Sequence, residues 1–178
     1  DLSAETGWQW DAGLQWRSDP FASIPLCRDL QLRYYQSYLY DLIQWSNPGG
    51  FRFRPLNIGQ AQLKGIELQV QGHLFPRIDW QWRSAWTSAL NTVTGETLAG
   101  RPDTEHRGRL ELDLGLALGQ VDYIYEAGTV FASGSSTRLQ NRNIWNLGLN
   151  GLWDGRGSVY ARLQNVFDQQ QMDVFGFP

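Results

Sequence analysis

Hydrophobic and polar residues alternate along much of the chain. In the segment RLELDLGLALGQVDYIYEAG (residues 109–128), leucine occupies every even position from 110 to 118, and charged or small residues occupy the odd positions between them. Alternation with a period of two residues is typical of a β-strand with one apolar and one polar face. Because the alternation resumes at Val121, the pattern predicts two strands joined by a tight turn at Gly119-Gln120.

The same pattern divides the chain into eight predicted strands, and no segment shows a convincing helical period. The strands are expected at residues 4–18, 28–46, 54–74, 78–92, 104–118, 120–131, 143–153 and 157–167. Short connections (74–77, 119–120 and 154–157) alternate with long ones (92–104, 131–142 and 168 onward), although 18–28 and 46–51 fit this scheme less well. Such asymmetry is typical of an outer-membrane β-barrel, which has tight periplasmic turns and long outer loops.

Aromatic residues of the apolar parity gather toward the two ends of the predicted strands. Those expected near the short turns are Trp16, Trp80, Trp82, Tyr123, Tyr125 and Trp153, and those expected near the long loops are Trp8, Tyr38, Tyr40, Trp86, Phe131 and Trp145. Two aromatic girdles are typical of a barrel whose apolar face meets lipid. A soluble β-sandwich with a tryptophan-rich core also alternates, so it remains the alternative architecture.

In the barrel interpretation, each strand has a lipid-facing and a lumen-facing side. We expect Trp80, Leu112, Leu114, Leu116 and Leu147 to point to lipid, and Glu67, Arg83, Glu111 and Asp113 to point to the lumen. An arginine at Leu114 should then cost about 2–4 kcal/mol if this leucine lies at the middle of the bilayer.

Composition narrows the class of protein further. The net charge of −3 and the pI of about 5.3 give no indication of a nucleic-acid partner. The mean hydropathy of −0.43 and the lack of a long apolar run exclude a transmembrane helix but not a barrel, whose alternating strands average out as polar. The single cysteine, Cys27, excludes an internal disulfide framework and supplies no metal-binding motif.

Four segments carry a family resemblance. They are YLYDLIQW (38–45), NIGQAQLKGIELQV (57–70), ETLAGRPDTEHRGRLELDL (96–114) and YARLQNVFDQQQMDVFGFP (160–178). In order and spacing they resemble strands and loops of TonB-dependent outer-membrane receptors. These include the strand that reads Asn-Ile-x-x-Ala-x-x-x-Gly-Val-Glu-Leu, the Leu-x-x-Arg-Pro loop, and the penultimate strand with its Asn-Leu-Phe-Asp. The departures are mild: Ile66 replaces valine, Val166 replaces leucine and Phe177 replaces tyrosine.

The resemblance implies an all-β fold, namely an antiparallel transmembrane β-barrel of 22 strands around an N-terminal plug. Residues 1–178 would supply about eight of these strands, as the C-terminal portion without the last strand, the plug domain or the TonB box. Such receptors lie in the outer membrane among lipid and lipopolysaccharide. They import a scarce nutrient, such as a ferric siderophore, haem or cobalamin, with energy passed through TonB.

Candidate chemistry is sparse, and we expect no enzyme activity, no cofactor and no metal site. Ser23, His73 and Asp79 could be written as a triad, but nothing places the serine in a nucleophile turn. His73 and His106 are expected at opposite strand ends, where they cannot chelate a metal together. The candidate ligand-binding residues are four arginines on or beside the outer loops, which could engage an anionic cargo: Arg52, Arg54, Arg138 and Arg142.

Two other functions remain open at this stage. The chain could be a complete eight-stranded barrel that serves as an adhesin or anchor, with its lumen filled by a charge network. That network would consist of Asp11, Arg17, Arg33, Glu67, Arg83, Glu111 and Asp113. A β-rich outer-membrane or secreted hydrolase is a third interpretation, and it lacks a catalytic constellation.

Overall fold

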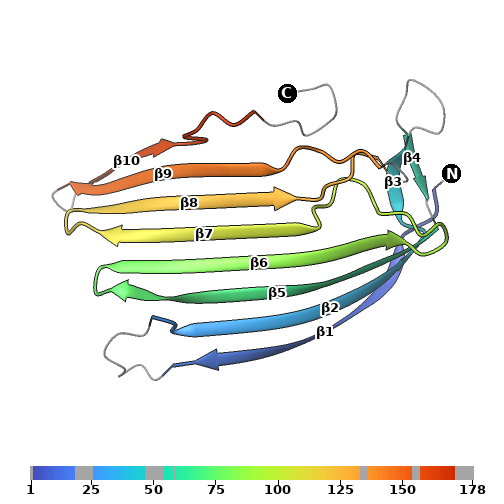
Figure 1. The fold of residues 1–178 in the computed structure, drawn as a ribbon, viewed down its shortest axis with the longest axis horizontal. Coiled ribbons are helices and arrows are strands. Elements are labelled where there is room, and N and C mark those ends of the chain that lie inside the picture. Colours follow the sequence, from blue (N-terminus) through green and yellow to red (C-terminus); the bar gives the residue numbers. More distant parts are fainter. Residues whose placement is uncertain are drawn as a thin grey trace.

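The computed structural model describes residues 2–18, 26–46, 54–57, 59–132, 136–153 and 157–170, and every regular element in these ranges is a β-strand (Figure 1). The strands are β1 (Thr6–Arg17), β2 (Asp29–Tyr40), β3 (Ile43–Ser46), β4 (Arg54–Asn57), β5 (Gln60–Phe75), β6 (Ile78–Asn91), β7 (Thr104–Asp113), β8 (Ala117–Ala127), β9 (Arg142–Trp153) and β10 (Gly157–Leu163). The described ranges hold no helix with the length and apolarity needed to span a membrane.

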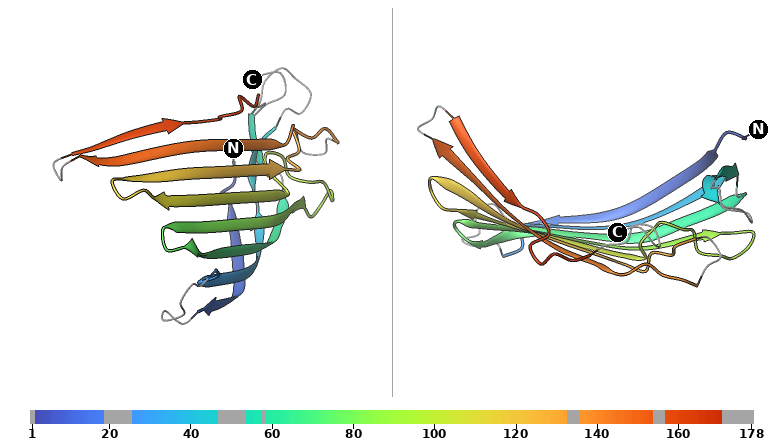
Figure 2. Two further views of the ribbon diagram at one scale, coloured as in Figure 1. Left: turned by 60° about the vertical axis from the view of Figure 1, so that its left-hand side comes forward. Right: turned by 90° about the horizontal axis from the view of Figure 1, so that it is seen from above.

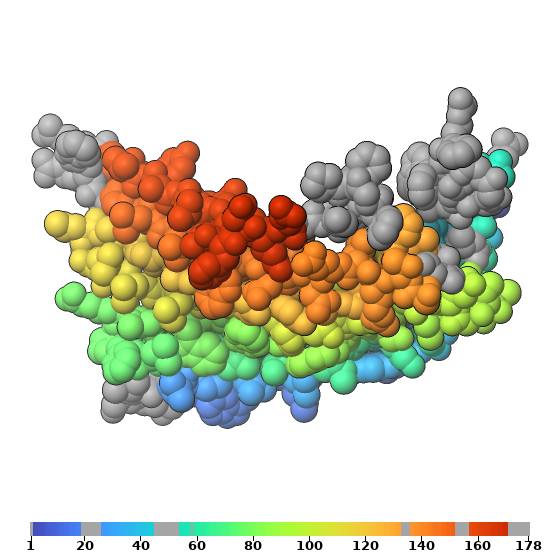
Figure 3. Space-filling model, turned by 45° about the horizontal axis from the view of Figure 1, so that its top comes forward, coloured from blue at the N-terminus to red at the C-terminus, as the bar shows by residue number. Residues whose placement is uncertain are grey.

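Eight of the strands form one antiparallel sheet in the order β1-β2-β5-β6-β7-β8-β9-β10, and β3 pairs only with β4. The sheet is curved and remains open, with β1 and β10 at opposite edges (Figure 2). The space-filling view shows β10 along an uncovered margin of the molecule (Figure 3). The predicted all-β antiparallel segment of about eight strands is therefore confirmed, whereas the described strands do not close into an eight-stranded barrel.

Two predicted strands are each divided in two. Segment 28–46 breaks between β2 and β3 at Asp41, and segment 54–74 breaks between β4 and β5 at Gly59; both residues have positive φ angles, 55° and 82°. The two breaks lie side by side, because the Leu42 N–H donates to the Gly59 carbonyl at 3.4 Å. A left-handed residue in each of two paired strands redirects both chains. As a result, β3 and β4 leave the large sheet as a separate hairpin.

The predicted turn at Gly119-Gln120 is wrong. The chain reverses at Leu114–Leu116, where Gly115 has a φ of 87° and the Leu114 N–H donates to the Ala117 carbonyl at 2.9 Å. Leu118 consequently pairs with Asp113 on the polar face. Leu114 lies in a turn at the end of the sheet, so the condition attached to its arginine variant, a position at the middle of the bilayer, is not met.

Strand register confirms the predicted division into two faces elsewhere. Trp80, Leu112 and Leu147 belong to the apolar face, and Glu67, Arg83, Glu111 and Asp113 belong to the polar face. The apolar face is uncovered: Leu14 is 74% exposed and Trp16 is 53% exposed. Because no second sheet packs against it in the described residues, the sandwich alternative is not supported.

Aromatic side chains cross the apolar face near the long connections, and we call five of them the loop-end belt: Trp8, Tyr38, Trp86, Tyr125 and Trp145. Tyr38 of β2 is in register with Leu90 of β6, whereas Trp145 of β9 is in register with Trp82, which lies eight residues before Leu90 on β6 and so nearer the turn end. The belt therefore shifts by about 27 Å along the strand direction while it crosses the five strand spacings from β2 to β9, a distance of about 24 Å across the sheet. If the belt is level with the membrane surface, the strands tilt by about 49°, close to the ~45° of transmembrane strands.

This placement corrects one part of the aromatic pattern. Tyr125 was expected near a short turn, but it lies two residues from the loop end of β8, since the real β7–β8 turn precedes Ala117. His106 is also in the loop-end half of the apolar face, where it contacts Ser84 at 2.9 Å and stacks on Tyr125. His73 is at the turn end of β5 on the polar face, so the two histidines lie at opposite ends as expected, and also on opposite faces.

Candidate functional site

The polar face carries the charged side chains that the structure brings together. On the N-terminal half of the sheet, Arg33 of β2 bridges Asp11 of β1 at 3.2 Å and Glu67 of β5 at 3.5 Å. Nearer the turns, Arg17 pairs with the buried carboxylate of Asp29 at 2.8 Å. Each pair joins neighbouring strands, so these residues fix the register of the wall while keeping the face hydrated and polar.

A second row of ion pairs crosses the C-terminal half. Arg107 of β7 pairs with Glu105 at 2.7 Å and with Glu126 of β8 at 3.8 Å, and Arg142 of β9 also reaches Glu126 at 3.4 Å. Arg109 pairs with Asp122 at 2.8 Å. These side chains are partly exposed, from 19% for Asp122 to 52% for Arg107, so each pair contributes only ~0.2–1 kcal/mol to stability. Together they form a wall that can hold water and polar ligands.

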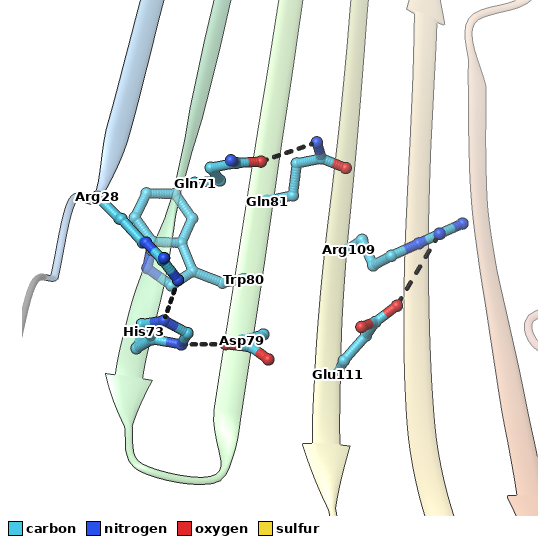
Figure 4. Close-up of a pocket in the computed structure, with 9 residues that line it drawn as sticks. Arg28, Gln71, His73, Asp79, Trp80, Gln81, Arg109 and Glu111 are labelled. Carbon is cyan, nitrogen blue, oxygen red and sulfur yellow. Dashed lines mark hydrogen bonds and ion pairs between the residues drawn. The ribbon is translucent and has the colours of Figure 1, made fainter. Parts of the chain in front are cut away.

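A hollow of about 310 Å³ lies at the turn end of the polar face (Figure 4). In it the His73 ring lies between two charged groups: the Arg28 guanidinium donates to Nε2 at 3.3 Å, and Nδ1 contacts the Asp79 carboxylate. Arg109 and Glu111 line the far side. Ser23, the serine of the Ser23-His73-Asp79 triad considered from the sequence, lies outside the described residues. This cluster can bind polar groups, and its described lining residues include no nucleophile in contact with the histidine.

The described ranges contain no group of three or more His, Cys, Asp or Glu side chains arranged to hold a metal ion. Cys27 is half-buried, and its Sγ lies 3.9 Å from the Asp29 carbonyl oxygen.

The loop rim consists of residues 92–103 on one side and of residues 128–132 and 136–141 on the other, and the two sides are hydrogen-bonded to each other. Arg138 joins them, because its guanidinium donates to Asp103 at 2.7 Å and to the Gly128 carbonyl at 3.0 Å. Leu98 and Val130 are buried beneath the rim. Gly128 has a φ of 81°, and a Cβ there would lie 2.6 Å from the Asp103 side chain. Arg138 thus holds the rim together as well as facing solvent.

Replacing Arg138 by alanine should loosen this rim. Loss of one charge-assisted contact between partly exposed groups should raise hydrogen exchange about threefold to tenfold at the amides of Gly100 and Leu139, which donate to carbonyls of the opposite or adjoining segment. Exchange would be measured on the full-length protein in detergent. Arg142→Ala removes a pair at the strand end and should leave the Gly100 amide unchanged; equal effects of both variants would contradict the role of Arg138.

Three of the four candidate arginines lie within the described residues. Arg138 and Arg142 are each paired with a carboxylate, Asp103 and Glu126 respectively. Arg54 is exposed on β4 and forms no ion pair within the described ranges. Arg52 lies outside the described residues. Asp103 was missed by sequence reasoning, although its position directly after Arg101-Pro102 in the loop motif marks the segment that the rim uses.

Comparison with known proteins decides the family. The model of the TonB dependent receptor-like β-barrel matches residues 1–166, which is most of the chain. The chain belongs to the TonB-dependent receptor family. A search of curated protein sequences found no match for this family member.

Solved structures share the fold of this TonB-dependent receptor chain. The copper transporter OprC superposes with a TM-score of 0.76 at 19% identity, covering 100% of this chain and 29% of OprC. The G324V mutant of the ferric enterobactin receptor PfeA from Pseudomonas aeruginosa gives 0.70 at 18% identity, with 94% and 26% coverage. The ferripyoverdine receptor of the outer membrane of P. aeruginosa gives 0.69 at 14% identity, with 99% and 25% coverage.

The present TonB-dependent receptor chain therefore spans between a quarter and a third of the length of these structures. At these identities the likeness establishes the fold alone. The family consists of receptors and transporters rather than enzymes, and its relatives are outer-membrane proteins.

Proposed function

We propose that the chain forms part of the barrel wall of an outer-membrane uptake receptor. The observation that carries the proposal is the pairing of an uncovered apolar face with an ion-paired polar face on one open, curved sheet. An uncovered apolar face of this extent requires an apolar surrounding, and the polar face requires water. Membrane lipid, including lipopolysaccharide, supplies the first, and the lumen of a barrel supplies the second.

The exposed edges support further strands beside β1 and β10. A strand edge in hydrocarbon leaves backbone N–H and C=O groups without partners, which costs several kcal/mol for each group. The sheet does not satisfy these edges by pairing β1 with β10. This favours a segment of a larger barrel, with a plug and a TonB-contacting part elsewhere in the protein, over the alternative of a small adhesin or anchor barrel.

The cargo in this proposal is a scarce nutrient, namely a ferric siderophore, haem or cobalamin. The names of two similar structures, the ferric enterobactin and ferripyoverdine receptors, support an iron chelate, and the name of a third adds copper to the candidates. Arg52, Arg54, Arg138 and Arg142 are the proposed contacts for an anionic cargo, because arginine offers a planar donor fork. Arg54 has the strongest claim among the three that are described, since carboxylates already engage Arg138 and Arg142.

Uptake measurements test this function. A strain that lacks the full-length gene should lose uptake of at least one labelled nutrient among siderophores, haem, cobalamin and copper. The complemented strain should regain uptake only when TonB is present. Unchanged uptake of every nutrient in the deletion strain would contradict the receptor proposal. Once the cargo is known, Arg54→Gln should weaken its binding, and unaltered affinity in alanine variants of all four arginines would exclude them as the site while leaving the function intact.

A further inference from the structure

The only lysine of the chain lies on the apolar face. Lys64 of β5 is in register with Gln36 of β2 on one side and with Ser88 of β6 on the other, and all three share the face that carries Ile66 and Leu68. Lys64 is exposed and forms no ion pair within the described ranges. Because β2 and β6 flank it on both sides, its neighbours on the two adjoining strands of this face are both described.

Polar side chains gather around this lysine. Gln36 and Gln62 both donate to the hydroxyl of Tyr38, at 2.6 and 2.5 Å, and Tyr34 donates to the Gln36 side-chain oxygen at 3.4 Å. We call Tyr34, Gln36, Tyr38, Gln62 and Lys64 the Lys64 patch. After these bonds, each glutamine keeps one N–H, Tyr38 keeps its hydroxyl proton, and the Lys64 ammonium keeps three donors. Within the described ranges the patch is therefore a cationic group beside several neutral donors that have no other partner.

The depth of the patch follows from the loop-end belt. The belt passes from Tyr38 on β2, in register with Leu90, to Trp86 on β6. Strand β5 lies between β2 and β6, so the belt should cross it midway between the levels of Leu90 and Trp86, which is the level of Ser88. The β5 residue in register with Ser88 is Lys64. A lysine costs ~2–4 kcal/mol at the middle of a bilayer and only ~0–1 kcal/mol near its interface. Lys64 therefore lies at headgroup level, at the loop end of the barrel.

We propose that the Lys64 patch binds the phosphate and sugar oxygens of a phosphorylated glycolipid of the outer leaflet, which is lipopolysaccharide. This rests on the proposed outer-membrane location. An ammonium that only reaches for water needs no neighbouring amides, whereas a phosphate beside sugar hydroxyls fits one ammonium flanked by amide and phenol donors. The patch thus names a specific lipid contact on the outside of the wall, separate from any cargo site.

The test uses the full-length receptor in detergent, titrated with bis-phosphorylated lipid A and followed by tryptophan fluorescence; Trp10 is in register with Gln36 beside the patch. Lys64→Leu should weaken binding about tenfold, as expected for the loss of a charge-assisted contact. Lys64→Arg should bind within about threefold of the parent. Dephosphorylated lipid A should bind the parent as weakly as lipid A binds Lys64→Leu.

Arg77→Gln is the matched control, because it removes the same charge from an exposed residue of the short β5–β6 turn at the opposite end of the sheet. It should leave lipid A binding unchanged. Equal binding by Lys64→Leu and the parent would overturn the proposal, and so would equally effective competition by phosphatidylglycerol vesicles. Uptake assays on the same variants separate the two proposals: loss of lipid A selectivity with normal uptake supports the patch, and absence of uptake in the parent contradicts only the receptor function.

Discussion

An arginine in place of Leu32 is expected to lower the free energy of unfolding by about 2–4 kcal/mol, the cost of this side chain near the middle of a bilayer. Leu32 is 41% exposed on the apolar face of β2, with Leu14 and Leu68 on either side. It lies six residues from Tyr38 of the loop-end belt, which places it about 14 Å below the belt along the membrane normal. This is close to the centre of the ~25 Å apolar band.

Urea titration of the full-length protein folded into vesicles would measure this loss as a shift of the unfolding midpoint. Gln31→Arg is the control on the same strand, since Gln31 belongs to the polar face and its arginine would meet water. Leu114→Arg is a second control, in which a leucine is again replaced by arginine. Because Leu114 lies in the β7–β8 turn, this substitution should lower the free energy of unfolding by no more than ~1 kcal/mol. A similar loss in all three variants would mean that the apolar face does not meet lipid.

The second large effect is expected at Gly65, where alanine should destabilise the protein by about 1–3 kcal/mol through overpacking. Gly65 is buried between β2 and β6, and a Cβ there would lie 2.7 Å from both the Trp86 carbonyl oxygen and the Tyr35 hydroxyl. Tyr35 lies opposite Gly65 and bonds to Thr87 at 3.0 Å, so its ring spans the glycine from one neighbouring strand to the other.

Gly148→Ala provides the comparison, because a Cβ at Gly148 would meet only the Gln120 Cβ, at 3.5 Å, which is an ordinary contact. It should change the free energy of unfolding by less than about 0.5 kcal/mol. Denaturant midpoints of the two variants, measured with the same protein in vesicles, give the difference directly. Equal stability of Gly65→Ala and Gly148→Ala would exclude close packing as the reason for the glycine in the motif LKGIEL.

Alternation was enough to predict the strands and their faces, because strand pairing preserves parity across the whole sheet. Once Trp80 is apolar-facing, Leu110 and Val121 follow through the register. The short connection at 74–77 and the long connection at 92–104 could also be predicted, since turn residues interrupt the pattern there. The family resemblance then supplied the barrel architecture, because alternation also occurs in soluble sandwiches and does not distinguish the two.

The errors arose where the local pattern and the backbone disagree. Leucines at 114, 116 and 118 continue the alternation through the β7–β8 turn, so apolarity hid the reversal that Gly115 makes. At Asp41 and Gly59 the pattern runs on while a left-handed backbone turns both strands aside, and such a turn is weakly encoded at an aspartate.

The site was less predictable because partners across the sheet are distant in sequence. Arg138 could be singled out as a loop cation, but its engagement by Asp103, 35 residues earlier, depends on how two loops pack. Lys64 could be counted from the composition, yet its neighbours follow only from the register of three strands, and the level proposed for it follows from the slope of the belt.

The strand tilt also determines how permeable this wall must be. At a tilt of about 45°, each strand takes up about 6.8 Å of circumference, so the eight strands cover about 54 Å. A ring of eight such strands would have a radius of about 9 Å, and its inward side chains would fill it. A ring of 22 strands would have a radius of about 24 Å, wide enough to admit a folded domain whose radius of gyration is ~13 Å. In that ring the wall would conduct ions and small solutes freely, so all selectivity would belong to whatever occupies the opening.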